Sequence, residues 1–138
     1  MITLTRAYYF SASHRLHVAQ FSDQRNQDLF GKCNNPHGHG HNYRLEISVR
    51  GEIEQATGRV VDLSRLDEIV NDRIVKYFDH KYINQDLPEF STKVATTEIL
   101  GEVINDRLQA VWPKEFPKLE KVGVQETLRN RFTIPASK

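Results

Sequence analysis

Cysteine is nearly absent from this chain of 138 residues, in which Cys33 is the single thiol. One cysteine excludes an internal disulfide and the small disulfide-stapled folds, and it is typical of a reducing compartment such as the cytoplasm. Glycine and proline are also scarce, at seven and five residues, and the sequence has no internal repeat. We therefore expect a single domain over residues 1–138, long enough to bury a core of its own.

The chain also lacks an excess of charge of either sign. It has 19 Lys and Arg residues and 18 Asp and Glu residues, which gives a net charge of +1. Without a basic field, neither a nucleic-acid partner nor a polybasic contact with a membrane is expected. The apolar stretches are far too short to cross a bilayer, and residues 1–13 lack the features of a signal peptide. These absences favour a small cytoplasmic enzyme subunit without nucleic-acid or membrane partners.

Histidine, by contrast, is concentrated at three alternate positions, His37, His39 and His41. Behind them, residues 43–50 alternate between apolar and polar side chains, which predicts a strand over about 41–53. Extended backwards, this alternation puts His39 and His41 on the apolar face. Two imidazoles there are costly unless something satisfies them. A metal ion does so, and neutral imidazole is the commonest nitrogen ligand of zinc.

The third ligand is expected from elsewhere in the chain. In an extended strand, His37 and His41 would lie roughly 13 Å apart at Cα, which strains their reach to one ion. His14 is the best candidate, because it continues the apolar parity of residues 2–12, which only Arg6 interrupts. If the two strands pair, His14 would lie opposite His39 and His41. The alternative is a set of unrelated core or surface histidines, but the His-x-His spacing with a partner in phase favours a metal site.

Two stretches with helical periodicity separate the first two strands from the last. One apolar stripe runs through 63–77 and a second through 100–111. Both stretches begin next to residues that commonly cap helices. These candidate caps are Asp62 or Ser64 for the first helix and Thr96 or Thr97 for the second.

The strand patterns complete the expected fold. The first strand spans 2–14, the second about 41–53, and later strands span about 119–128 and a short stretch through 132–134. A long loop over 17–38, with a helical turn near its middle, has the length of a functional loop. These elements predict an α+β fold with a four-stranded antiparallel sheet and two helices on one face.

Two further residues each fit more than one role. Cys33 can be a small buried residue, a fourth zinc ligand in a closed structural site, or a general base whose thiol pKa is lowered by a nearby cation or histidine.

Glu126 lies on the same side of its expected strand as Val122 and Val124, so it points inward unless the strand ends before it. A buried carboxylate needs a partner, which favours a functional role for Glu126.

Several motifs occur in a fixed order: Ser-Ala-Ser-His ends at His14, Cys-x5-His-Gly-His spans 33–41, and Asp-His-Lys occupies 79–81. In this order they resemble the 6-pyruvoyl tetrahydropterin synthase family. The resemblance covers nearly the whole chain, and its further matches lie at Phe10–Leu16, Phe30–Pro36, Gly38–Tyr43, Gly51–Ile53, Ala56–Gly58, Leu63 and Thr96–Glu98.

The resemblance implies both an assembly and an activity. The fold would be the tunnelling fold, in which three subunits join their sheets into a β-barrel and two trimers stack into a homohexamer. The activity would be that of a zinc-dependent lyase. It would convert 7,8-dihydroneopterin triphosphate to 6-pyruvoyl-tetrahydropterin with elimination of triphosphate, a step of tetrahydrobiopterin-type pterin biosynthesis.

The resemblance also implies roles for single residues. The metal ligands would be His14, His39 and His41, and the proton-transfer residues Cys33, Asp79 and His80. Around Glu126 the sequence departs from the family, which usually has an aromatic residue before this glutamate and Asp-Asn-Asn soon after it. The pterin would be held by Glu126 with Thr96 and Thr97, and candidates to steady the triphosphate are Arg15, His17 and Lys32.

Two other functions are weighed against this one. Relatives in queuosine biosynthesis use the same zinc site but make 6-carboxytetrahydropterin, and they tend to have Cys-x3-His-Gly-His. The Cys-x5-His-Gly-His run of this chain is the pattern of the pyruvoyl-forming members. The non-enzyme alternative is a zinc module in which Cys33 is a structural ligand.

Overall fold

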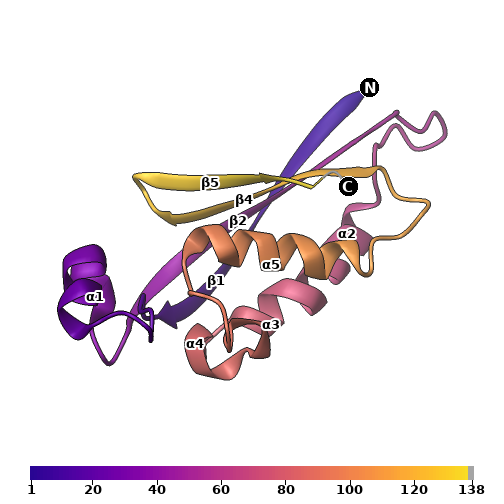
Figure 1. Cartoon of the computed structure of the whole chain (residues 1–138). Coiled ribbons are helices and arrows are strands. Elements are labelled where there is room, and N and C mark those ends of the chain that lie inside the picture. The colour runs from indigo at the N-terminus through magenta and orange to yellow at the C-terminus, as the bar shows by residue number, and fades with distance from the viewer. Residues whose placement is uncertain (137–138) are drawn as a thin grey trace.

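The computed structural model describes residues 1–136, which fold into one mixed sheet covered by helices on one face (Figure 1). The four long strands are β1 (Ile2–His14), β2 (His39–Gly51), β4 (Lys118–Thr127) and β5 (Asn130–Pro135). They pair antiparallel in the order β1-β2-β4-β5.

A fifth strand was not expected from the sequence. The two-residue β3 (Lys81–Tyr82) pairs parallel with the end of β1, so the sheet is five-stranded and mixed rather than four-stranded and antiparallel. Two residues are too few to show an alternating pattern, so periodicity cannot detect such a strand. The coarser prediction of an α+β fold is confirmed.

The two main helices cover the sheet near the expected positions. The first comprises α2 (Leu63–Val70), a π-helical turn (Asn71–Val75) and α3 (Lys76–Phe78), and the second is α5 (Thr97–Gln109). The side chain of Asp62 accepts hydrogen bonds from the first turn of α2. Thr96, rather than Thr97, caps α5 by accepting a hydrogen bond from the amide of Ile99.

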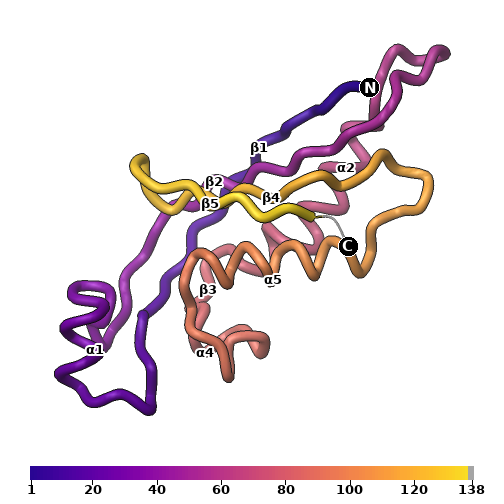
Figure 2. The backbone as a smooth tube through the Cα atoms, turned by 45° about the horizontal axis from the view of Figure 1, so that its top comes forward, coloured from indigo at the N-terminus to yellow at the C-terminus, as the bar shows by residue number. Residues whose placement is uncertain are grey.

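Shorter helical segments lie in the connections. In the loop between β1 and β2 are α1 (Asp23–Phe30) and a 3-10 turn (Gly31–Asn34). Between β3 and α5 are α4 (Ile83–Asp86) and a second 3-10 turn (Pro88–Phe90). Figure 2 shows that α1 projects beyond the paired ends of β1 and β2, whereas β3 and α4 lie beside the start of α5.

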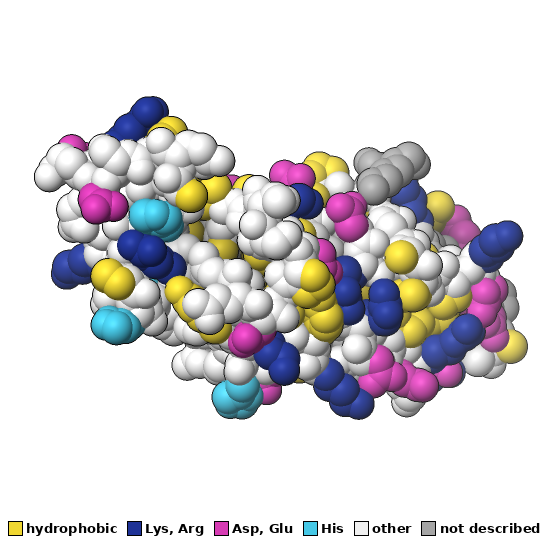
Figure 3. Space-filling model, turned by 60° about the horizontal axis from the view of Figure 1, so that its bottom comes forward, with side chains coloured by type: hydrophobic (Ala, Val, Ile, Leu, Met, Phe, Trp, Pro, Cys, Tyr) yellow, Lys and Arg dark blue, Asp and Glu magenta, His cyan; other side chains and the backbone are white. Residues whose placement is uncertain are grey.

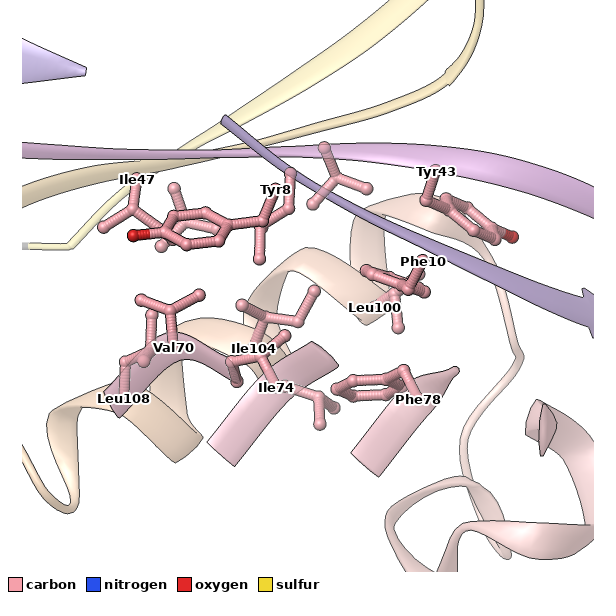
Figure 4. Close-up of a cluster of buried hydrophobic side chains, with 14 of the residues drawn as sticks. Tyr8, Phe10, Tyr43, Ile47, Val70, Ile74, Phe78, Leu100, Ile104 and Leu108 are labelled. Atoms are coloured by element: carbon pink, nitrogen blue, oxygen red, sulfur yellow. The ribbon is translucent and has the colours of Figure 1, made fainter. Parts of the chain in front are cut away.

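The core lies between the sheet and these two helices. Phe10 stacks on Tyr43 and Phe78, with ring centroids 5.1 and 5.6 Å apart. A Cβ on Gly101 would come within 2.2 Å of Ile134 Cδ1, so α5 can approach β5 this closely only with glycine there. Figure 4 shows Tyr8, Phe10, Tyr43 and Ile47 from the strands facing Val70, Ile74, Phe78, Leu100, Ile104 and Leu108 from the helices.

Arg6, which interrupts the apolar parity of β1, has a structural explanation. Its Nε and Nη2 donate to the two carboxylate oxygens of Asp67 on α2, at 2.6 and 2.8 Å. The hydroxyl of Tyr8 donates to the same carboxylate at 2.7 Å. This bidentate pair ties the strand to the helix, so the charge can lie beside the core face.

The surface carries both signs of charge. Figure 3 shows basic and acidic side chains interspersed over the face that it draws. Within residues 1–136, no helix is long and apolar enough to cross a membrane.

Candidate metal centre

The strand register brings three histidines together at one end of the sheet. In the β1–β2 ladder His14 lies directly opposite His39, and Ala12 lies opposite His41. His14, His39 and His41 therefore share the face that carries the core, as their parity predicted. Gly38, directly before β2, has φ +74°, and a Cβ there would lie only 3.1 Å from the carbonyl oxygen of His14.

The ring nitrogens of these histidines converge. Nε2 of His14 and Nε2 of His39 are 3.1 Å apart. Two nitrogen ligands of one tetrahedral zinc ion would be about 3.3 Å apart. The spacing therefore suits two ligands of a common ion.

His14 is held in the orientation that a ligand needs. Its Nδ1 lies 2.7 Å from the carbonyl oxygen of Ala95, just before α5, and that oxygen can only accept a hydrogen bond. The proton is thus on Nδ1, and the lone pair of Nε2 faces the cluster. The buried Nδ1 of His39 and Nε2 of His41 have no hydrogen-bond partner among the described residues. A cation at the centre of the cluster would satisfy Nε2 of His41 and would bind the facing Nε2 atoms of His14 and His39.

Glu126, at the end of β4, completes the cluster. One ligand atom from each of His14, His39, His41 and Glu126 can be chosen so that all lie within 4.8 Å of one another. Oε1 of Glu126 is 2.8 Å from Nε2 of His41, without the alignment of a hydrogen bond. Its Oε2 accepts a hydrogen bond from the hydroxyl of Thr97.

The electrostatics of the cluster suit a cation. The His14 imidazole, 3.6 Å away, is the main cause that lowers the pKa of Glu126, and with Thr97 and His41 it outweighs burial and brings that pKa to about 2. Burial is the main cause that lowers the pKa of both His39 and His41. The neutral imidazoles of His39 and His41 and the ionised carboxylate of Glu126 therefore face each other at neutral pH, and together with His14 this donor set can hold a metal ion.

Cys33 lies in the 3-10 turn after α1 and is half-buried. It is not a member of the four-residue cluster, so the geometry gives no support to a closed site in which Cys33 is a ligand. Burial and the charge of Glu126 raise the pKa of its thiol, whereas the sequence interpretation expected a lowered pKa. That expectation depended on a nearby cation or histidine, and a lowered pKa in the metal-loaded protein stays a prediction.

Asp79 and His80 form a pair at the end of the first helix. Nδ1 of His80 lies 2.9 Å from Oδ2 of Asp79, and the His80 side chain is 84% exposed. Ser11 of β1 anchors both residues, because its amide donates to Oδ1 of Asp79 and its carbonyl accepts from the amide of His80. The Ser11 amide is also the main cause that lowers the pKa of Asp79.

His80 also has an unusual backbone. Its φ of +60° lies in the left-handed region, and it is the one residue other than glycine with this conformation in the described chain. Such conformations cost free energy and cluster at functional sites. The described contacts include none between Cys33 and either Asp79 or His80.

The remaining candidate residues divide between the site and the surface. Thr97 is buried and contacts Glu126, whereas Thr96 serves as the helix cap. His37 and Lys32 are exposed, and neither belongs to the four-residue cluster.

Comparison with known proteins identifies the family. The family model described as 6-pyruvoyl tetrahydropterin synthase matches residues 3–136. The chain belongs to the 6-pyruvoyl tetrahydropterin synthase family. The human 6-pyruvoyl tetrahydrobiopterin synthase is 46% identical over 127 residues, which cover 92% of this chain and 86% of the relative. The protein of that name from Poecilia reticulata is 42% identical, covering 92% of this chain and 85% of the relative.

The fold of the family is also recognised in a solved structure. The 6-pyruvoyl tetrahydropterin synthase of Caenorhabditis elegans matches this structure with a TM-score of 0.89 and 37% identity. The match covers 99% of this chain and 96% of that chain. The family resemblance seen in the sequence motifs is therefore confirmed over almost the whole length.

Sequence reasoning missed two contacts of the cluster. Glu126 was expected to point inward, but its contact with the histidines was not foreseen. The periodicity of a single strand does not show how β1, β2 and β4 pair. The carbonyl of Ala95 carries no side-chain signal at all. No feature of the sequence indicated that backbone from that segment reaches His14.

Proposed function

We propose that this chain is the subunit of a zinc-dependent lyase that converts 7,8-dihydroneopterin triphosphate to 6-pyruvoyl-tetrahydropterin with elimination of triphosphate. The observation that carries this function is the cluster of three imidazoles and one carboxylate. It lies in a chain whose relatives are named for this activity.

Zinc is the metal that this donor set favours. Three neutral imidazoles are nitrogen ligands, which zinc binds readily, whereas magnesium and calcium prefer sites made of oxygen. We assign the ligands as His14, His39 and His41. Three protein ligands leave a coordination position for substrate, as in catalytic rather than structural zinc sites.

Glu126 and Thr97 are assigned to the pterin ring. A pterin presents an amino group and a ring N–H side by side, and a carboxylate can accept hydrogen bonds from both. The low pKa of Glu126 keeps this acceptor ionised, and the Thr97 hydroxyl orients one of its oxygens. Thr96 has a positioning role, since it caps the helix that carries Thr97.

Proton transfer is assigned to Cys33, Asp79 and His80. When bound, zinc supplies a Lewis acid that makes the C–H next to a coordinated hydroxyl more acidic. Cys33 accepts a proton as general base, and Asp79 orients His80 and supports its charged form. In this way the chain moves protons along the substrate side chain while triphosphate leaves.

The absence of a described contact between Cys33 and the Asp79–His80 pair favours a shared active site. Asp79 and His80 are fixed to Ser11, and the carbonyl of Cys33 accepts a hydrogen bond from the amide of Leu16. Because the His80 side chain is 84% exposed and its segment is anchored, His80 is available to a second copy of the chain. We therefore assign Asp79 and His80 to the site of a neighbouring subunit.

A trimer whose sheets close into one β-barrel, doubled into a hexamer, is the assembly that this arrangement supports. The outer edge of β5 is unpaired in the described chain, and closure between subunits would pair such edges. Native mass spectrometry should find a hexamer, or a trimer at low concentration. A fully active monomer would contradict the assembly. The cytoplasmic location stays a prediction from the composition.

The activity is tested with purified, zinc-loaded protein, 7,8-dihydroneopterin triphosphate and no reductant. We expect 6-pyruvoyl-tetrahydropterin and free triphosphate, without acetaldehyde. Stoichiometric acetaldehyde with a carboxylated pterin would instead assign the chain to 6-carboxytetrahydropterin synthases. Protein that holds zinc without turnover would favour the non-enzyme alternative.

A further inference from the structure

A cavity lies beside the loop after β1, and its wall begins at Arg15, the residue after the ligand His14. Its volume is about 330 Å³, within the range of small-molecule sites. One wall comes from residues 15–20 and the other from segments 82–85 and 90–94. The polar residues that line it include Arg15, His17, Tyr82, Ser91, Thr92 and Lys93.

The charged side chains that line this cavity are all basic, although the net charge of the whole chain is only +1. No Asp or Glu lines it, whereas Arg15 and Lys93 bring two cationic side chains. Ser91 and Thr92 add hydroxyls from the same loop as Lys93. A cavity with cations and hydroxyl donors and without carboxylates is suited to a polyanion.

Arg15 is held in place with its terminal nitrogens available. Its Nε donates to the carbonyl of Asn34 at 3.0 Å. Its backbone is clamped by Asn84, whose Oδ1 accepts from the Arg15 amide and whose Nδ2 donates to the Arg15 carbonyl, at 2.8 and 2.7 Å. Neither Nη atom has a partner among the described residues. A pre-positioned guanidinium of this kind can donate two parallel hydrogen bonds to a phosphate.

His17 is fixed as a donor by the same neighbour, Asn34. Nδ2 of Asn34 donates to the carbonyl of Leu16 at 2.8 Å, which sets the orientation of the amide. The same Nδ2 lies 2.9 Å from Nδ1 of His17, so this ring nitrogen accepts. The proton of the neutral imidazole is then on Nε2, which is free to donate to an anion.

Residues of the cavity, or residues that hold them, are neighbours along the chain of groups at the metal centre. Arg15 directly follows the ligand His14, and Val94, in the cavity wall, directly precedes Ala95. The Ala95 carbonyl is the partner of His14 Nδ1. Asn34, which holds both Arg15 and His17, directly follows Cys33. The cavity wall therefore follows directly, along the chain, from groups that form or support the metal centre.

We propose that this cavity is the triphosphate subsite of the substrate, with Arg15, His17 and Lys93 as its principal donors. The assignment rests on the proposed function, because it needs a substrate that carries a triphosphate near the reacting carbons. It replaces Lys32, which does not line the cavity, by Lys93, which was not foreseen from the sequence.

The test measures binding rather than turnover. Zinc-loaded protein is titrated calorimetrically with inorganic triphosphate and, separately, with 7,8-dihydroneopterin, which lacks phosphate. We expect Arg15→Gln to weaken triphosphate binding about tenfold or more and Lys93→Gln about threefold or more, because each removes a charge-assisted contact. Binding of the phosphate-free pterin should stay within about twofold of the wild type. Lys114→Gln, an exposed lysine beyond the other end of α5, is the matched control and should change neither.

The role of His17 is tested by His17→Asn, whose side-chain oxygen can still accept from Asn34 but which lacks a donor at the position of Nε2. It should weaken triphosphate binding without lowering the melting temperature. Unchanged triphosphate affinity in both Arg15→Gln and Lys93→Gln would overturn the subsite, even if the wild type turns over substrate. Equal losses for the triphosphate and the phosphate-free pterin would overturn it too, since they would indicate general damage.

The two proposals fail separately. If the wild type catalyses the reaction but the variants bind triphosphate normally, the subsite is wrong and the function stands. If the wild type binds inorganic triphosphate through Arg15 and Lys93 without any turnover, the function is wrong and the anion site stands.

Discussion

The metal cluster and the proton-transfer groups are built differently. His14 and His39 lie on paired strands, opposite each other in the ladder, with their ring nitrogens 3.1 Å apart. Cys33 lies in a 3-10 turn, and Asp79 and His80 lie where a helix ends and the backbone turns through a left-handed residue. The first group is assembled within one chain, whereas we assign the second to more than one subunit.

This difference separates binding from reaction. Strand pairing fixes ligand positions and needs no further partner, so one chain can hold a metal ion. The groups that move protons have no contact with each other among the described residues, and we assign them to different subunits of one site. Metal loading should therefore depend on the three histidines alone, and turnover on the assembly as well.

The largest effect is expected from the cluster itself. His14→Ala should reduce bound zinc from about one ion per chain to near zero and abolish turnover. It removes the ligand whose ring is oriented by the carbonyl of Ala95. Metal content is measured by mass spectrometry after dialysis. His37→Ala, an exposed histidine outside the cluster, is the matched control and should retain zinc. Stoichiometric zinc in His14→Ala would refute the ligand assignment.

Cys33→Ala should separate the two regions most clearly. We expect zinc content and melting temperature close to those of the wild type, with turnover lower by about 10²–10⁴-fold, because a general base is lost. Metal content, a thermal melt and the product assay are measured on one preparation. Release of zinc or unfolding would show instead that Cys33 is a ligand.

Glu126→Gln tests the boundary between metal and pterin. The side-chain amide of glutamine has the shape of the carboxylate but only one accepting oxygen, because an NH2 group replaces the other. The amino group and the ring N–H of the pterin need two acceptors. We expect zinc to be retained and KM for the substrate to rise about tenfold or more. Zinc loss comparable to that of His14→Ala would make Glu126 a fourth ligand and would close the site.

The smallest effect is expected far from the site, at the Arg6–Asp67 pair. The hydrogen bond from Arg6 is the main cause that lowers the pKa of Asp67, so the folded state binds the proton less readily than the unfolded chain. The resulting stabilisation is present above the unfolded pKa of about 4 and is lost as the pH falls through the lower folded value. Asp67→Asn should lower the melting temperature by a few degrees at pH 7, and its deficit should shrink below about pH 4. A deficit independent of pH would show that packing, not charge, is responsible.

Much of the site could be predicted because it lies on strands. The period-two alternation placed His14, His39 and His41 on one face, and antiparallel pairing then had to bring them together. The contact of Glu126 with this cluster was beyond prediction, since it depends on where β4 ends relative to β2. Arg6 broke the pattern for a reason that only its distant partner Asp67 explains.

The loops were less predictable for a physical reason. The two-residue β3 and the donor Lys93 belong to segments without periodicity, whose positions are set by long-range contacts such as the clamp of Asn84 on Arg15. Motif order identified Cys33, Asp79 and His80 as important. It could not show which neighbours anchor them, such as Ser11 for Asp79 and His80.

The most direct test of the account is complementation between two inactive variants. Cys33→Ala and His80→Ala are co-expressed with different tags, and the mixed, zinc-loaded oligomers are purified through both tags and assayed for turnover. If one subunit supplies the thiol and another the Asp79–His80 pair, random mixing should restore about a quarter of wild-type activity, since half of the thiols and half of the histidines are intact. Mixed oligomers that hold zinc but are no more active than either parent would contradict a site shared between subunits.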